Sequence, residues 1–282
     1  TTGASNTAVG SSALGANTTA NNNTAVGYVA LGGTTTGTAN TAVGASALQN
    51  NITGNYNTAV GQSSLTACTT IGNTALGYNS SSGVTTGNYN VGVGYSALPS
   101  VTTGDGVIGI GQGAASTLTT GSYGVYIGYG SSASAAGAGS EIVIGGPNFT
   151  GKGGSTGFIN PNGGGVYQGN NGATWSVTSD QRLKKNIVNN NTGLDIINQI
   201  QVRNFEYRLP EEITDVPQDQ AIAKTGIQLG VIAQELQQIL PECVKTESTG
   251  VMTVDADNLT WYLINAVKEL TARVAQLEAK GA

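Results

Sequence analysis

The sequence has 282 residues, with no histidine, two cysteines and 10% charged residues. Without histidine, the chain cannot form a Ser–His–Asp triad or a histidine-containing zinc site. Cys68 and Cys243 match no metal-ligand spacing and suggest no disulfide framework. A net charge of −5 offers no basic surface to nucleic acid. We therefore expect no metal, no cofactor and no nucleic-acid partner.

Long apolar runs are also missing from the sequence. No stretch approaches the roughly 18 apolar residues of a membrane span, and no signal peptide is recognisable. We therefore expect no membrane insertion. Because the chain begins with Thr1 instead of Met, we interpret it as a fragment of a longer protein.

Charge and glycine are distributed unevenly along the chain. Only three of the 27 charged residues precede Ser179, namely Asp105, Glu141 and Lys152, whereas 38 of the 43 glycines precede it. Two regions of different composition therefore meet within the stretch "TSDQRLKKNI", residues 178–187.

The first region is a repeat built on the string "NTAVG". Consecutive copies lie 17 residues apart, with one spacing of 16. A fixed period of this length is typical of a solenoid. The nine register glycines that end the copies are Gly10, Gly27, Gly44, Gly61, Gly77, Gly94, Gly111, Gly128 and Gly145.

Each copy predicts one short β-strand. The residue before the register glycine is aliphatic and the residue two positions earlier is β-branched, so both lie on one face of the strand. We expect this face to point inward, with a small Ala or Gly between the two on a crowded surface. A leucine four residues after the glycine is expected to make a second inward contact on a return strand. These leucines are Leu14, Leu31, Leu48, Leu65 and Leu98.

Asparagines also recur at the repeat period, and stacking would align them into a side-chain ladder. Nine coils at about 4.8 Å each predict a rod about 40 Å long. Because so thin a rod buries little apolar surface, we expect it to associate with other copies of itself. The ladder asparagines are Asn6, Asn23, Asn40, Asn57, Asn73 and Asn90.

The string "GIGQG" at residues 109–113 could also indicate a phosphate-binding loop. Its glycines fit the register of the repeat, and neither a Walker lysine nor a Rossmann helix follows them. The repeat therefore accounts for these glycines better than a nucleotide site does.

Residues 1–145 resemble the head of trimeric autotransporter adhesins, on the strength of the strand-plus-glycine core of "NTAVG". In that family, "NSVAIG"-like repeats build a left-handed parallel β-roll with three chains side by side. The period here is longer than is usual there. Similar "NTAVGYxAL" arrays occur in phage fibre-like proteins, so the resemblance implies a trimeric parallel β-roll or β-solenoid.

Residues 146–178 form a segment rich in Gly and Asn. This composition could give a flexible linker. Four aromatic residues favour a packed transition segment instead. They are Phe149, Phe158, Tyr167 and Trp175.

The second region, residues 179–282, has the patterns of a small α+β domain. We expect helices at 191–200, 233–240 and 257–279, and strands at 201–208, 226–233, 242–247 and 251–255, with a polar loop at 209–224.

The last helix carries apolar residues at alternating spacings of four and three, which is the pattern of a coiled-coil seam. A single helix packed on its own domain would be the alternative. Few residues remain at the end of the chain to cover the seam, so partner helices are favoured and we expect a homotrimer. The seam residues are Leu263, Val267, Leu270, Val274 and Leu277.

Three strings in this region, "SDQRLKKNI", "GVIAQELQQILPECV" and "VDADNLTWYLINAVKEL", occur in the order found in the intramolecular chaperone auto-processing domain. That domain ends phage tailspikes and tail fibres, including endosialidases. The resemblance implies that residues 179–282 trimerise, bring three β-rich chains into register and are then released by cutting a Ser-Asp bond. In this chain the bond joins Ser179 to Asp180.

The resemblance also assigns roles to the residues around that bond. Ser179 matches the serine and Lys184 matches the lysine of a self-cleaving serine peptidase. A lysine can take a proton from serine when burial or neighbouring cations lower its pKa. Arg182 and Lys185 would supply such cations, and Asp180 would help to position the bond.

The chemistry leaves an alternative open at this bond. A serine that attacks its own carbonyl would form a strained four-membered ring. Water attack assisted by Ser179, or a contribution from a neighbouring chain, would avoid it. A cap that is never cut, with Lys184 and Arg182 as surface charges, would leave the trimerisation role intact.

We therefore expect a homotrimeric phage tail fibre segment in the virion, in contact with other tail proteins. Its rod would contribute to host attachment, with Tyr28, Tyr78 and Tyr95 binding a surface receptor such as a glycan, unless they only cover the roll. The alternative is a bacterial cell-surface adhesin with a permanent trimerisation cap. The rod's first 145 residues have only Asp105 and Glu141 as acids, which disfavours a paired-carboxylate glycosidase.

Overall fold

The computed structural model describes residues 2–160, 166–169, 176–177, 179–222 and 224–281. The chain divides into two compact units, Thr1–Leu183 and Lys184–Ala282. We describe each unit by itself.

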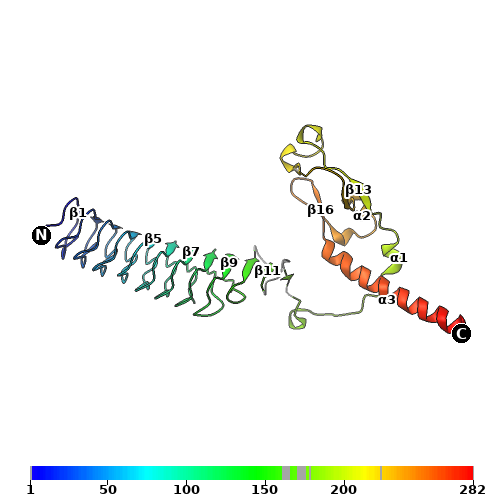
Figure 1. Cartoon of the computed structure of the whole chain (residues 1–282), viewed down its shortest axis with the longest axis horizontal. Helices are drawn as coiled ribbons and strands as arrows, with labels where there is room; N and C mark the ends of the chain where they lie inside the picture. Colours follow the sequence, from blue (N-terminus) through cyan, green and yellow to red (C-terminus); the bar gives the residue numbers. More distant parts are fainter. Residues whose placement is uncertain (1, 161–165, 170–175, 178, 223, 282) are drawn as a thin grey trace. The chain divides into compact units, whose positions relative to one another are not determined.

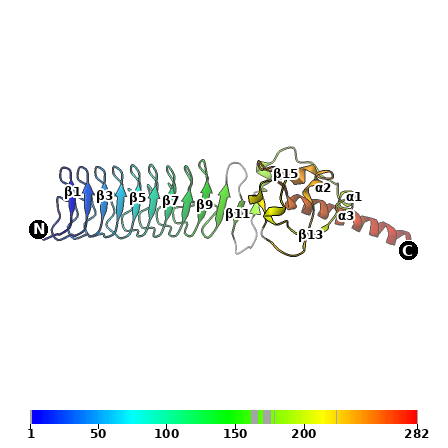
Figure 2. The same cartoon turned by 90° about the horizontal axis from the view of Figure 1, so that it is seen from above.

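The first unit is a parallel β-solenoid, whose stacked coils are visible in Figure 1 and Figure 2. Each coil contributes one short strand, and equivalent residues of successive strands lie side by side, as in the pairing of Thr24 with Thr41. This confirms the solenoid of nine coils that the period predicts. The strands are β1 (Thr7–Val9), β2 (Thr24–Val26), β3 (Thr41–Val43), β4 (Thr58–Val60), β5 (Thr74–Leu76), β6 (Val91–Val93), β7 (Ile108–Ile110), β8 (Val125–Ile127) and β9 (Ile142–Gly145).

The inward face of these strands differs from the sequence-based expectation. The central residues, such as Ala25, Ala42 and Val143, are fully buried, whereas the flanking aliphatic residues are partly exposed. Val43 is 37% exposed and Ile110 is 39% exposed. The expected inward face was therefore wrong. A coil of 17 residues is so narrow that mostly small side chains fit between the strand and the opposite wall, so the branched side chains point outward.

The leucines after the register glycines are buried, as expected, but they do not lie on a return strand. Leu31 and Leu48 have no exposed surface, and each sits in a turn with a φ of +50°. The amide of Leu31 donates to the carbonyl of Ala47 in the next coil at 3.0 Å. The wall opposite the strand is thus built from left-handed turns whose backbone bonds to the neighbouring coil.

The register glycines are required by the close stacking of coils. Gly44 has a φ of +132°, and a Cβ atom at this position would lie 2.6 Å from the carbonyl oxygen of Gly61. Backbone of the next coil occupies that space, so a side chain cannot be accommodated by rotamer changes.

The predicted asparagine ladder is present. The Oδ1 atom of Asn40 accepts a hydrogen bond from the amide of Asn57 at 2.9 Å, and its Nδ2 group donates to the carbonyl of Gly54 at 2.8 Å. The pattern continues until the amide of Val107 donates to Asn90. These side chains satisfy backbone groups that would otherwise be buried without partners.

The segment after β9 adds one further parallel strand to the rod. β10 (Gly157–Asn160) pairs with β9, and β11 (Val166–Gln168) and β12 (Ser176–Val177) follow antiparallel. Phe158 is buried and contacts Phe149 edge to face, with ring centroids 6.3 Å apart. These contacts show packing up to Asn160. Trp175 and the side chain of Tyr167, which were also expected to pack in this segment, lie outside the part of the chain that the structure describes.

The second unit is a small α+β domain, as predicted. Its strands and its first two helices are shorter than the sequence patterns indicated, whereas the last helix, expected at 257–279, extends over Ala256–Gly281. Its core contains Leu236, Leu240 and Cys243. The elements are α1 (Leu194–Ile197), β13 (Arg203–Phe205), β14 (Gln228–Gly230), α2 (Ala233–Gln237), β15 (Val244–Thr246), β16 (Met252–Val254) and α3 (Ala256–Gly281), with β13 antiparallel to β14 and β15 antiparallel to β16. The described residues also form short 3₁₀ turns. These are η1 (Gln181–Leu183), which ends the first unit, and η2 (Pro210–Glu212), η3 (Gln218–Gln220) and η4 (Pro241–Cys243) in the second.

Candidate functional site

The Ser179–Asp180 bond lies directly before the turn η1. The amide of Leu183 donates to the carbonyl oxygen of Asp180 at 3.1 Å, which closes the turn. Ser179 is exposed and the residue before it, Thr178, lies outside the described residues. The bond is therefore held at the start of a short, exposed 3₁₀ turn.

Asp180 and Arg182 are brought together by this turn. The Oδ1 atom of Asp180 accepts the Arg182 amide at 2.8 Å, and the guanidinium Nη2 donates to its Oδ2 atom at 2.5 Å. Hydrogen bonds from the Arg182 side chain and then from its amide lower the pKa of the Asp180 carboxyl. The sequence assigned Arg182 a role beside Lys184, but its guanidinium is engaged with the residue on the carboxyl side of the bond.

Lys184 and Lys185 begin the second unit and are both exposed. The boundary between the units thus falls between Leu183 and Lys184. Each of Ser179 and Lys184 takes part in an interaction within the protein. The proposed serine and lysine roles remain predictions from the sequence.

The helix α3 uses two different faces. Asn265 donates to the carbonyl oxygens of Asn190 at 2.8 Å and Thr192 at 3.1 Å, and Ala266 is buried. The Glu269 carboxylate accepts the amide of Leu194 at 3.3 Å. This face holds the helix on its own domain.

The predicted seam lies on a neighbouring face of α3, because a helix turns by about 100° per residue. Its five residues are between 47% and 69% exposed. The helix therefore packs on its own domain and still presents the seam to solvent, so the two alternatives from the sequence are compatible. That partner helices cover the seam remains a prediction.

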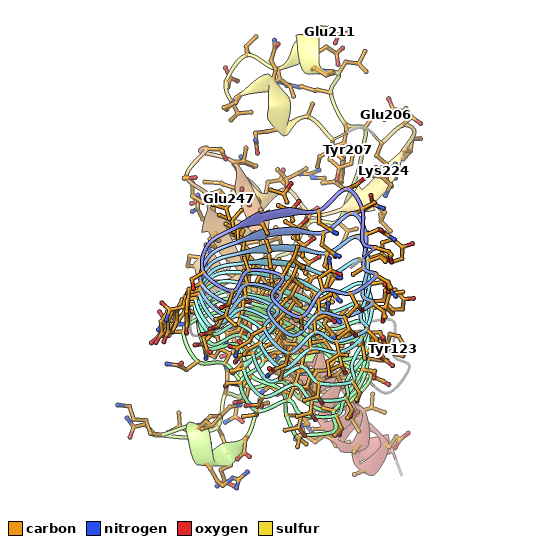
Figure 3. The ribbon with its side chains drawn as sticks, turned by 90° about the vertical axis from the view of Figure 1, so that its left-hand side faces the viewer. Tyr123, Glu206, Tyr207, Glu211, Lys224 and Glu247 are labelled. Carbon is orange, nitrogen blue, oxygen red and sulfur yellow. The ribbon has the colours of Figure 1, made fainter. Side chains whose placement is uncertain are left out.

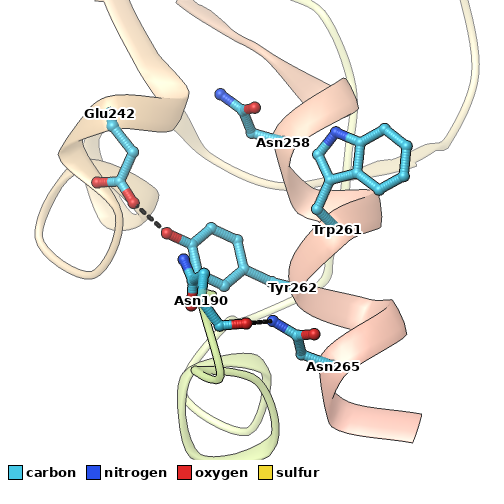
Figure 4. A pocket seen from close by; sticks show the side chains of 6 residues that line it. All are labelled: Asn190, Glu242, Asn258, Trp261, Tyr262 and Asn265. Carbon is cyan, nitrogen blue, oxygen red and sulfur yellow. Dashed lines mark hydrogen bonds between the residues drawn. The ribbon is translucent and has the colours of Figure 1, made fainter. Parts of the chain in front are cut away.

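A pocket of about 210 Å³ lies beside the first turns of α3. Figure 4 shows the side chains that line it. The Tyr262 hydroxyl donates to a carboxylate oxygen of Glu242 at 2.5 Å. This bond lowers the pKa of Glu242 and raises that of Tyr262. Trp261 lies at the same pocket and is 64% exposed. Sequence patterns did not single out Glu242, Trp261 or Tyr262, although the strings "GVIAQELQQILPECV" and "VDADNLTWYLINAVKEL" contain them.

The two acids of the rod have structural partners. The buried Glu141 accepts the Tyr126 hydroxyl and the amides of Ser134 and Gly153 at 3.3, 3.0 and 2.8 Å. Burial and the neighbouring Glu141 charge raise the pKa of Tyr126. Asp105 accepts the amide of Asn88 at 2.7 Å. Both carboxylates therefore serve the stacking of coils.

The tyrosines proposed for receptor binding are exposed on the rod. Tyr28, Tyr78 and Tyr95 are 62%, 48% and 56% exposed, and the rings of Tyr78 and Tyr95 stack with centroids 5.3 Å apart. Tyr123 projects from the outside of a coil at another register (Figure 3) and is 69% exposed. The tyrosines present aromatic faces to solvent, which leaves receptor binding as a testable role.

The part of the chain that the structure describes contains no cluster of three or more His, Cys, Asp or Glu side chains that could hold a metal ion. None of its helices has the length and apolarity to cross a membrane.

Comparison with known proteins bears on the second region. Residues 179–245 match the family described as the chaperone of endosialidase. The match begins at Ser179, the first residue of the proposed cleavage bond. The family resemblance drawn from the sequence is thereby confirmed over these residues.

Curated relatives match a little over a third of the chain. Myelin regulatory factor homolog 1 of Caenorhabditis elegans is 31% identical over 104 residues, which is 36% of this chain and 11% of the relative. A probable tail fiber protein of Escherichia phage Phieco32 is 32% identical over 111 residues, 37% of this chain and 14% of the relative. The long tail fiber protein of Enterobacteria phage T2 is 30% identical over 122 residues, 40% of this chain and 8% of the relative.

The chain thus spans about a tenth of the length of the curated relatives it matches. The chaperone match, the tail fibre relatives and the parallel β-solenoid together fit a tail fibre with a C-terminal chaperone domain.

Proposed function

We propose that this chain is a segment of a homotrimeric phage tail fibre, located in the virion tail, whose C-terminal domain aligns three rods and then cuts itself off between Ser179 and Asp180. The observation that carries the proposal is the chaperone match over residues 179–245, which begins at the serine of that bond. The tail fibre relatives support the phage context. The exposed seam of α3 supports trimerisation, because five apolar side chains at coiled-coil spacing are left without cover in one chain.

The cleavage is a hydrolysis. Water adds to the carbonyl carbon of Ser179, the C–N bond to Asp180 breaks, and the proton released by water ends on the new amino group of Asp180. The Ser179 hydroxyl assists this water, with Lys184 as the base. Direct attack by Ser179 on its own carbonyl would need a four-membered ring. The Arg182 guanidinium fixes the Asp180 side chain and so orients the leaving group.

Cutting after assembly has a physical advantage for a repetitive rod. A slip by one coil changes few contacts, so the register needs an external clamp. Once the clamp is removed, the rod loses its nucleus for reassembly and becomes kinetically trapped.

Intact mass under denaturing conditions tests the cleavage. We expect fragments 1–179 and 180–282 from the parent chain, an uncut chain for Ser179→Ala and Lys184→Ala, and slower cutting for the adjacent Lys185→Ala. Lys245→Ala is the distant control and should cut normally. A parent chain that stays whole would mean a permanent trimerisation cap, which is the arrangement expected of a surface adhesin.

Host attachment is the second part of the proposal. It is supported by the solvent-facing aromatic rings of Tyr28, Tyr78 and Tyr95, since such rings can stack on sugars or other flat apolar groups. We expect replacement of all three by Ala to weaken binding of the rod to host cells while its circular dichroism spectrum stays unchanged. Unchanged cell binding would remove this role.

A further inference from the structure

The outward-pointing side chains of the rod form a continuous surface, which we call the outer strand face. It consists of the first and third residues of strands β1–β9. These positions contain no charged residue, and none of them is buried in a single chain. Contiguous apolar patches of this kind are uncommon on monomers and mark interaction sites.

The outer strand face changes in composition along the rod. In strands β1–β5 the first residue is threonine, whereas in β6–β9 it is Val91, Ile108, Val125 and Ile142. The third residue stays aliphatic throughout. Burying a threonine hydroxyl without a hydrogen-bond partner is unfavourable, so strands β6–β9 offer the stronger apolar contact.

We propose that the outer strand face is the contact surface between copies of this chain within the rod, and that association starts at β6–β9 and proceeds toward β1. The proposal rests on the homotrimer of the proposed function and names the surface and direction by which it forms. Strands β6–β9, which offer the stronger apolar contact, are the part of the face nearest in sequence to the chaperone domain. Under the proposed function, that domain is where the chains are first brought together.

The pitch of the face identifies the occupant as another copy of the same chain. Its two columns of side chains repeat once per coil, at about 4.8 Å, and an identical parallel rod is a partner with the same repeat. Sugar recognition would favour aromatic and hydrogen-bonding groups, and the exposed Tyr28, Tyr78 and Tyr95 lie after the register glycines, outside this face.

The size of the face explains why a clamp is needed. Strands of three residues stacked over nine coils cover roughly 400 Å² per chain, about half of the roughly 800 Å² per partner in a stable interface. The face is therefore too small to hold free chains together at low concentration. It is large enough to close once α3 has raised their local concentration.

Cross-linking tests the surface directly. In the full chain, Ile110→Cys on the face and Ser116→Cys off the face lie in the same repeat, and the native Cys68 and Cys243 are buried. With a short bismaleimide, we expect covalent chain dimers from Ile110→Cys and few from Ser116→Cys. During refolding, dimers should form earlier with Ile110→Cys than with Val43→Cys.

Two lysine substitutions test whether the contact between copies is stronger at β6–β9 than at β1–β5. Val43→Lys and Ile110→Lys replace third-position side chains of nearly equal exposure, 37% and 39%, so each single chain should fold normally by circular dichroism. We expect Ile110→Lys to increase dissociation of the assembled rods about tenfold or more, because buried unpaired lysines are costly. Val43→Lys should have a clearly smaller effect.

The outcomes separate this proposal from the homotrimer itself. If native mass spectrometry of the parent chain shows only monomers, the homotrimer fails and this proposal fails with it. If it shows trimers but Ile110→Cys gives no more dimers than Ser116→Cys, the homotrimer stands and the contact surface is wrong. If Val43→Cys cross-links as early as Ile110→Cys, or both lysine variants act equally, the direction is wrong.

Discussion

The two units of this chain differ in how they bury their apolar side chains. The rod buries mostly small side chains and places nearly every coil against its neighbours through backbone bonds and asparagine ladders. The C-terminal unit has a small hydrophobic core. Its apolar residues Val188, Ile227 and Leu229 are between 74% and 85% exposed. The contrast teaches that each coil of the rod buries its interior against the next coil of the same chain and keeps its exposed aliphatic side chains on the outer strand face, whereas the C-terminal unit leaves apolar side chains exposed on several of its elements.

The largest expected loss of stability comes from replacing a register glycine of the rod. Gly44→Ala combines backbone strain of about 1–3 kcal/mol with a close contact to Gly61 that adds about 1–3 kcal/mol. In the C-terminal unit, Gly250→Ala carries strain alone, because a Cβ at its φ of +85° meets nothing within 4 Å. Thermal unfolding by circular dichroism should show the larger loss for Gly44→Ala. Equal losses would mean that close stacking does not stabilise the rod.

The next prediction compares the replacement of one leucine in each unit by alanine. Leu48→Ala empties a fully buried position and should lower the free energy of unfolding by about 2–5 kcal/mol. Leu263 is 52% exposed, so Leu263→Ala should change the stability of a single chain little and instead promote dissociation of the proposed trimer. Chemical denaturation and sedimentation velocity measure the two quantities. A large loss of single-chain stability from Leu263→Ala would assign the seam to the domain's own fold.

A smaller effect is expected from replacing an asparagine by alanine, and it should depend on whether the asparagine lies inside the rod or on an exposed part of α3. Asn57→Ala leaves the amide of Asn73 and the carbonyl of Thr70 without their partner inside the rod, which should cost about 1–3 kcal/mol. Asn265→Ala removes bonds at an exposed position of α3, where water can replace the side chain. Peptide-resolved hydrogen exchange should show faster exchange around residue 73 in the first variant and a weaker change around residue 190 in the second.

The smallest effect is the pH dependence of the Tyr262–Glu242 bond. The bond lowers the pKa of Glu242, so its contribution to stability is present above the ordinary glutamate pKa of about 4.3 and is lost as the pH falls through the lowered value. Tyr262→Phe should therefore flatten the acid side of the stability curve of the C-terminal unit. The rod's hydrogen exchange should show no matching change. An unchanged acid limb would mean that the bond contributes nothing in solution.

Local patterns were enough to predict most of the architecture. The 17-residue period gave the number of coils and the position of each strand, since a repeat that stacks on itself must place equivalent residues in register. In the C-terminal unit, apolar spacing predicted the type of each main helix and strand, although the helix expected at 191–200 extends only over Leu194–Ile197. Its ends are set by packing on α3, which the local pattern does not contain.

The candidate site was predictable only in part. The string that begins at Ser179 marked the bond, and the family match begins at the same residue. The pairing of Arg182 with Asp180 was not predicted, because it depends on the 3₁₀ turn that brings residues two apart into contact. The Tyr262–Glu242 pair was missed for a similar reason, since its partners are 20 residues apart in the sequence.

The sequence by itself determined the repeat, the register glycines, the asparagine ladder and the spacing of the α3 seam, because each depends on a regular residue spacing along the chain. Only the tertiary structure decided which face of the strands points inward. Alternation along a strand separates two faces but does not say which one meets the core. The narrow coil made that choice, since mostly small side chains such as Ala42 fit inside it while the branched side chains at Thr41 and Val43 remain outside.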